Sequence, residues 1–176
     1  MSKEKPLYCS NFVFIKKETI MELKTFYKIR FNDCDSFKHL NNSGYIDYML
    51  NAREDHLKEF HDISMTYLYS KGSGWMVNKH EIIYLNPANY GEQVCIKSNL
   101  MKYGNDSLMV EMTMWDENET HIKAILWTKF IHINLLTGKR DNHPEWFEKL
   151  AIPLENSGIL ESSLSERLKV LMAQKV

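Results

Sequence analysis

The chain is poor in cysteine, has no excess of either charge and lacks any long apolar run. Its 176 residues include three cysteines, Cys9, Cys34 and Cys95, which are scattered and never spaced as CxxC. That number and spacing argue against a disulfide framework and a zinc site, and they favour a reducing, cytoplasmic setting. The net charge is −1, and no basic stripe alternates with aromatics, so nucleic acid is not the expected partner. No apolar run approaches the ~20 residues of a membrane-spanning helix.

The chain does contain enough apolar sequence for one core, with 44% apolar residues. Tyr45, Met49, Ala52 and His56 recur at three- and four-residue spacings, which predicts a helix over residues 42–60 with one buried face. Strands are expected at 23–31, 74–85, 92–103, 107–116 and 121–135, and short helices at 64–70, from 143 onward and within 157–174.

The order of these elements predicts an α+β fold. One long helix should pack on a five-stranded, mainly antiparallel sheet whose last four strands follow one another as a meander. Repeats, low-complexity tracts and convincing domain linkers are absent from the sequence.

The segment RFNDCDSFKHLNN, residues 30–42, carries the strongest sign of chemistry. Asp33 and Asp35 come at the end of the first strand, and the pair Asn41-Asn42 then offers N-caps to the long helix. The free N–H groups of a helix start and the positive end of its dipole favour a developing negative charge. A carboxylate beside such a terminus is suited to cleaving an activated acyl group.

This segment resembles the signature of the hotdog-fold acyl-CoA thioesterases, in the 4-hydroxybenzoyl-CoA thioesterase-like branch. The family pattern runs roughly R-F-x-D-x-D-x-x-G-H-V-N-N-x-x-Y, and its helix often contains Ala-Arg. Lys38 stands where the family has glycine, and Leu40 where it has valine. Glycine at the first of these positions relieves a strained turn. The matching residues are Arg30, Phe31, Asp33, Asp35, His39, Asn41, Asn42, Tyr45 and Ala52-Arg53.

The resemblance implies a hotdog domain over residues 22–150, which leaves an extension at 1–21 and, from the sequence itself, an expected helical tail at 151–176. It also implies that Asp35 attacks the thioester carbonyl or activates a water. The backbone N–H of Asn42 would polarise the thioester oxygen, and the implied substrate contacts are His39, Asn41 and Tyr45.

Each of these residues also has a structural interpretation. Asp35 could simply close an Asx-turn before a helix, which is a common structural role of aspartate. Asn42 could simply cap the N-terminus of the helix. Asp33 is expected to order the loop or pair with Arg30, and Tyr45 is expected in the core slightly more than in the acyl pocket. Three acids of the long helix, Asp47, Glu54 and Asp55, lie off its apolar stripe and are expected in solvent or at an interface. Three histidines of the expected strands, His80, His121 and His132, lack the spacing of metal ligands.

The resulting expectation is a thioesterase that hydrolyses an acyl-CoA or acyl carrier protein (ACP) thioester to the free acid and the thiol. No metal or redox cofactor is expected, since CoA belongs to the substrate. The family places its active sites between protomers, so a homodimer or homotetramer is expected. The rival hypotheses are a non-hydrolytic acyl binder on the same fold and, less favoured, a hotdog hydratase or dehydratase.

Overall fold

The computed structural model describes residues 22–156, 158–159 and 163–173 of the chain. The expected extension at 1–21 and the last three residues of the expected tail lie outside these residues. Among the helices that the structure describes, none is both long and apolar enough to cross a membrane.

The elements follow the predicted order closely, with most strand ends shifted by one or two residues. Their bounds are β1 (Lys24–Lys28), η1 (Phe31–Asp33), α1 (Asn42–His61), α2 (Met65–Ser70), β2 (Ser73–Tyr84), β3 (Gln93–Tyr103), β4 (Ser107–Asp116), β5 (Ile122–Asn134), β6 (Lys139–Arg140), α3 (Glu145–Ala151), η2 (Ile152–Leu154) and α4 (Leu164–Ala173).

The strands form one antiparallel sheet in the order β1-β3-β4-β5-β2, and the two-residue β6 adds to β5. The predicted meander therefore holds for β3, β4 and β5 but is wrong for β2. That strand pairs with β5, from Ser73 opposite Asn134 to Tyr84 opposite Ala124. The reason is that α1 carries the chain across the sheet from β1 at one edge, so β2 enters at the opposite edge.

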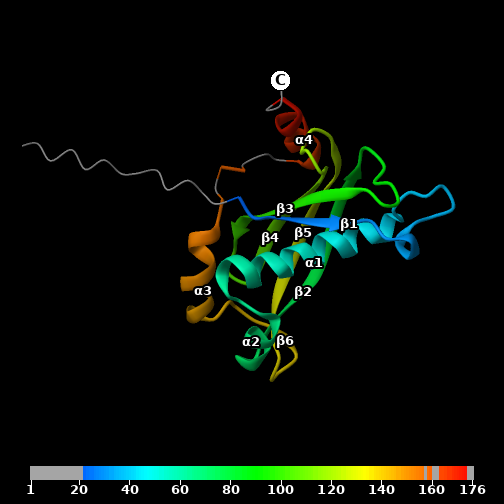
Figure 1. The fold of residues 1–176 in the computed structure, drawn as a ribbon. Coiled ribbons are helices and arrows are strands. Elements are labelled where there is room, and N and C mark those ends of the chain that lie inside the picture. The colour runs from blue at the N-terminus through cyan, green and yellow to red at the C-terminus, as the bar shows by residue number, and fades with distance from the viewer. Residues whose placement is uncertain (1–21, 157, 160–162, 174–176) are drawn as a thin grey trace, which may run out of the picture.

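The sheet curls around α1, which lies across one of its faces (Figure 1). The predicted apolar stripe is the buried side of this helix: Tyr45, Met49, Ala52 and His56 are all buried against the sheet. From β4, Leu108, Val110, Met112 and Met114 join the same core. This is the α+β arrangement that the hotdog resemblance implies.

The other face of the sheet is covered as well, because α4 packs on β2 and β5. Its Leu164 is buried in a second apolar cluster with Cys95, Trp115 and Trp127. The Arg167 guanidinium also donates to both oxygens of the buried Glu111 carboxylate, at 2.8 and 2.9 Å. A helical tail was predicted from the sequence, but its place on the sheet was not.

Candidate active site

The loop between β1 and α1 is folded around the carboxylate of Asp35. Oδ1 of Asp35 accepts hydrogen bonds from the backbone N–H groups of Phe37, at 2.8 Å, and His39, at 3.0 Å. The backbone N–H of Asp35 donates to the His39 carbonyl at 2.8 Å. This is the Asx-type turn foreseen as the structural interpretation, and it fixes one carboxylate oxygen in place.

The turn needs a left-handed residue, and the chain supplies Lys38 there with φ at 65°. This is the position at which the family pattern has glycine, the residue that adopts such angles without steric cost. The expected strain is therefore real, and the loop still closes with the Lys38 N–H donating to the Asp35 carbonyl at 3.0 Å.

The second oxygen of Asp35, Oδ2, accepts no hydrogen bond from the described residues, and the side chain is exposed. A carboxylate held by one oxygen and open at the other presents a free lone pair in a fixed direction. Such an oxygen can take a proton from a water molecule or attack a carbonyl directly.

Asp33 ties the loop to α1, and its carboxylate forms no ion pair with the Arg30 side chain. Its Oδ2 accepts from the Tyr48 hydroxyl at 2.6 Å, and its backbone carbonyl accepts from the N–H and Nδ2 of Asn41 at 2.9 and 3.0 Å. Burial, and then the bond to Asp33, raise the pKa of Tyr48 to about 12. Of the two expected roles for Asp33, loop ordering is the one that the geometry shows.

The start of α1 differs from the sequence prediction in how it is capped. Asn41 is the N-cap residue, but its side chain accepts nothing from the helix because its amide donates to Asp33 instead. Asn42 is the first helical residue, and its carbonyl accepts from the Tyr84 hydroxyl at 3.0 Å. The prediction of side-chain capping by this pair is therefore wrong. The uncapped N–H groups of the first turn stay available to an anionic ligand.

The remaining candidates lie on either side of this terminus. His39 is half-buried, and its backbone forms an isolated antiparallel β-bridge with that of Asn89. Its ring stacks on the ring of Phe37, with centroids 6.5 Å apart. Tyr45 is 4% exposed, and its hydroxyl accepts from the Ala88 N–H at 2.8 Å. The core position expected for Tyr45 is thus the one observed, while substrate contact by His39, Asn41 or Tyr45 remains a prediction.

The other titratable candidates are either exposed or bound to structural partners. Asp47 and Glu54 are exposed on α1, whereas Asp55 accepts from the Tyr27 hydroxyl. His80 bonds Thr128 across the strands at 2.9 Å. His121 lies in the turn before β5 beside Asp116, and His132 contacts the Asp141 carbonyl. No group of three or more acids, histidines or cysteines in the described part of the chain is placed to hold a metal.

The comparisons with known proteins agree with this geometry. A model of the thioesterase-like superfamily matches residues 29–150, which include the Asp35 loop, α1 and every strand of the sheet except β1. The chain belongs to the thioesterase-like superfamily. No protein among the curated sequences matches the chain.

Solved structures show that this thioesterase-like chain has the hotdog fold. The YbaW probable thioesterase from Escherichia coli is 22% identical, with a TM-score of 0.67 over 76% of this chain and 99% of that one. The protein SAV2348 from Staphylococcus aureus, solved in complex with CoA, is 14% identical with a TM-score of 0.70, over 84% and 92%. Slr0204, a 1,4-dihydroxy-2-naphthoyl-CoA thioesterase from Synechocystis, is 15% identical with a TM-score of 0.65, over 74% and 96%.

Two features of this thioesterase-like chain were not foreseen. The loop that holds Asp35 carries exposed aromatics: Phe31 is 74% and Phe37 77% exposed, and Phe31 meets the ring of Tyr90 edge-on. In addition, a cavity of about 290 Å³ lies beneath the second half of α1, with Arg53 in its wall. No local signal in the sequence marks the second feature, because the wall around Arg53 is formed by strands and helices far from it along the chain.

Proposed function

We propose that the protein hydrolyses an acyl-CoA or acyl-ACP thioester to the free acid and the thiol. The observation that carries this proposal is the state of the loop before α1. Asp35 is held through Oδ1 and open at Oδ2, and the loop leads into a helix whose first turn has no side-chain cap. A base or nucleophile and an electrostatic site for an oxyanion are the two parts that thioester cleavage requires.

In the proposed reaction, the thioester oxygen lies at the N-terminus of α1, near the backbone N–H of Asn42. Oδ2 of Asp35 either removes a proton from an attacking water or attacks the carbonyl itself, giving an acyl intermediate that water then hydrolyses. In both routes the C–S bond breaks, the thiolate leaves and is protonated, and the carboxylic acid is released. The thiolate is a good leaving group, so Asp35 and the helix terminus need no further acid.

The proposed substrate is a CoA or ACP thioester, and it needs no cofactor besides this carrier. Support comes from the family and from a neighbour solved with CoA, SAV2348. Exposed Phe31 and Phe37 offer apolar surface beside Asp35 to the substrate or to a second protomer. We also propose a cytoplasmic location, as the scattered cysteines favour; Cys34 and Cys95 are both free.

We propose that the working form is a homodimer or a dimer of dimers. Both edges of the sheet, β1 and β2, lack a further strand among the described residues. On β2, Met76 and Val77 are exposed next to the unpaired backbone of an edge strand, a combination that a second copy would cover. Pairing of the two β2 strands would build each active site from residues of both protomers.

A release assay tests the proposed activity. Free thiol is measured with a panel of short-, medium- and long-chain and aromatic acyl-CoAs, together with their equilibrium binding. Turnover of at least one thioester well above its spontaneous hydrolysis supports the proposal. Tight binding of acyl-CoAs with no thiol release from any acyl-CoA or acyl-ACP would instead favour the non-hydrolytic acyl-binding protein. In that case the Asx-turn would be the whole role of Asp35.

A further inference from the structure

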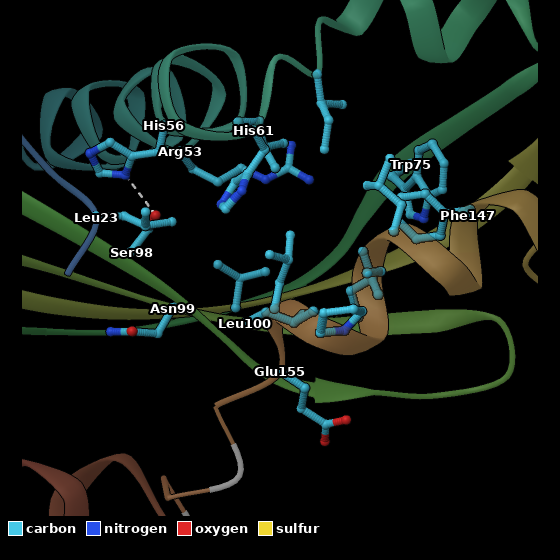
Figure 2. Close-up of a pocket in the computed structure, with 18 of the residues that line it drawn as sticks. Leu23, Arg53, His56, His61, Trp75, Ser98, Asn99, Leu100, Phe147 and Glu155 are labelled. Carbon is cyan, nitrogen blue, oxygen red and sulfur yellow. Dashed lines mark hydrogen bonds between the residues drawn. The ribbon is translucent and has the colours of Figure 1, made fainter. Parts of the chain in front are cut away.

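The cavity beneath the second half of α1 is separate from the Asp35 loop. It lies between α1, the middle of β3, the first half of β4, and the segment formed by α3 and η2 (Figure 2). Arg53 stands eleven residues after Asn42, which at the α-helical rise is roughly 16 Å along the axis. Between them, Met49 and Ala52 are fully buried against the sheet, so packed side chains separate the two places.

Arg53 is the unusual group in the wall of this cavity. Its guanidinium lies over the ring of Phe130, 4.6 Å from the centroid, and it forms no hydrogen bond or ion pair with any described residue. Arg53 is half-buried and a guanidinium has five N–H donors, so its partial withdrawal from water has a cost that an acceptor or an anion would offset. Contact with an aromatic face offsets only part of that cost.

The two histidines of the cavity wall, His56 and His61, add no charge to that of Arg53. Nδ1 of His56 bonds Ser98 Oγ at 2.7 Å, while Nε2 of His56 and Nε2 of His61 are buried without a hydrogen-bond partner in the described part of the chain. Burial lowers the pKa of His56 to about 4 and also lowers the pKa of His61, so both rings are neutral near pH 7. Arg53, whose pKa burial lowers only to about 10, therefore carries the positive charge of this wall.

The rest of the wall is largely apolar. Trp75 and Phe147 lie at one side, and Leu100 lies on the strand that faces the helix (Figure 2). Glu155 is the acid of the lining, and its carboxylate points away from the space that Arg53 enters. A ligand matched to these walls has an apolar body and one anionic acceptor group.

We propose that this cavity is a binding site for an apolar carboxylate, whose carboxylate pairs with Arg53 and whose chain lies against Leu100, Trp75 and Phe147. Arginine and carboxylate form a bidentate, charge-assisted pair. A volume of about 290 Å³ is near the lower end for small-molecule pockets. It is about twice the ~150 Å³ apolar cavity that accommodates benzene, which corresponds to roughly a dozen non-hydrogen atoms, the size of decanoate.

Two kinds of molecule carry an apolar chain with a carboxylate, and only the choice of these two rests on the proposed function. A free fatty acid is the product of thioester hydrolysis, and an acyl thioester with a carboxylate at its far end carries the same group. The packed Met49 and Ala52 close the direct path from this protomer's own Asp35. An acyl thioester would therefore have to enter from another side or from a partner's site.

The test is calorimetric titration with decanoate and with decanol, which has the same chain without the charge. Wild-type protein should bind decanoate at least tenfold more tightly than decanol. Arg53→Met should weaken decanoate binding at least tenfold and leave decanol nearly unchanged, and Arg53→Lys should retain part of the difference. Lys58→Met, an exposed cation of the same helix, is the matched control and should behave as wild type.

Equal affinity of wild-type protein for decanoate and decanol would overturn the proposal, without any reliance on a variant that might misfold. Decanoate binding unaltered by Arg53→Met would overturn it too. The mono-CoA thioester of decanedioic acid, titrated into Asp35→Asn protein, separates the two sources. Binding that Arg53→Met weakens assigns the carboxylate to a thioester, and binding of the free acid alone assigns it to the product. Neither readout requires hydrolysis, so failure of the proposed activity is recorded separately.

Discussion

At the scale of single residues, the conformation of Lys38 shows what the loop costs the protein. A non-glycine residue in the left-handed region costs roughly 1–2 kcal/mol, whereas glycine adds entropy of roughly 0.4–1 kcal/mol to the unfolded chain. Lys38→Gly should therefore raise the free energy of unfolding by about 0.5–1 kcal/mol. Lys38→Ala keeps the strain and should leave it unchanged. Urea unfolding of both variants checks this, and equal effects of glycine and alanine would show that the side chain matters and the φ angle does not.

Single residues also mark what sequence alone could and could not predict. The stripe of Tyr45, Met49, Ala52 and His56 was readable, because helical periodicity is local. The direction in which the Asn41 amide points was not, since it depends on a carbonyl eight residues earlier, that of Asp33. The placement of Arg53 in a cavity wall likewise depends on β3 and on α3, which are far from it in sequence.

At the scale of elements, His56 couples α1 to β3 in a way that depends on pH. Burial lowers its pKa from 6.5 to about 4, so the unfolded state binds more protons than the folded state between these values. Its contribution to stability is complete above pH 6.5 and is lost as the pH falls toward 4, by at most ~1.4 kcal/mol per pH unit. Urea unfolding should show His56→Asn to be less stable than wild type at pH 7. The two curves should converge by pH 4, and a constant gap would contradict the account.

The contact between α4 and the sheet rests on a buried ion pair. In Arg167→Met protein the buried Glu111 carboxylate keeps the hydrogen bond from the Trp127 ring N–H, at 3.0 Å, but loses the charge and the hydrogen bonds of the Arg167 guanidinium. Removing one partner of such a pair costs roughly 3–5 kcal/mol, whereas replacing both with apolar groups is often neutral. Arg167→Met should thus be strongly destabilised in urea unfolding, and Glu111→Leu combined with Arg167→Met should recover most of the loss. Lys169→Met, exposed on the same helix, is the control; a double variant no more stable than Arg167→Met would count against this explanation.

The elements also show where sequence reasoning reaches its limit. Strand positions and the α+β class were predicted correctly, because alternation in β4 and turn residues between strands are local signals. The pairing of β2 with β5 was not, because it depends on how far α1 carries the chain across the sheet. The burial of both faces of β4 follows from α4, which comes about fifty residues later.

At the scale of the whole molecule, the proposed dimer makes a prediction about mass. Light scattering at micromolar concentration should give at least twice the monomer mass, and activity per protomer should fall where dilution dissociates the dimer. Met76→Glu on β2 should reduce the mass to that of a monomer, because it adds charge beside the unpaired edge. Met172→Glu on α4 is matched to it, since both methionines are 58% exposed, and should leave the mass unchanged. A monomer with full turnover would contradict both the assembly and the shared site.

The most direct test of the central claim is thiol release by Asp35→Asn protein. The amide keeps Oδ1 as an acceptor for the N–H groups of Phe37 and His39, so the loop, the melting temperature and the assembly should not change. It cannot act as base or nucleophile, and we expect turnover to fall by ~10²–10⁴-fold. Asp33→Asn, which touches the loop's bond to Tyr48, should lose much less. Turnover of folded Asp35→Asn within a few-fold of wild type would contradict the assignment of Asp35 as the group that carries the reaction.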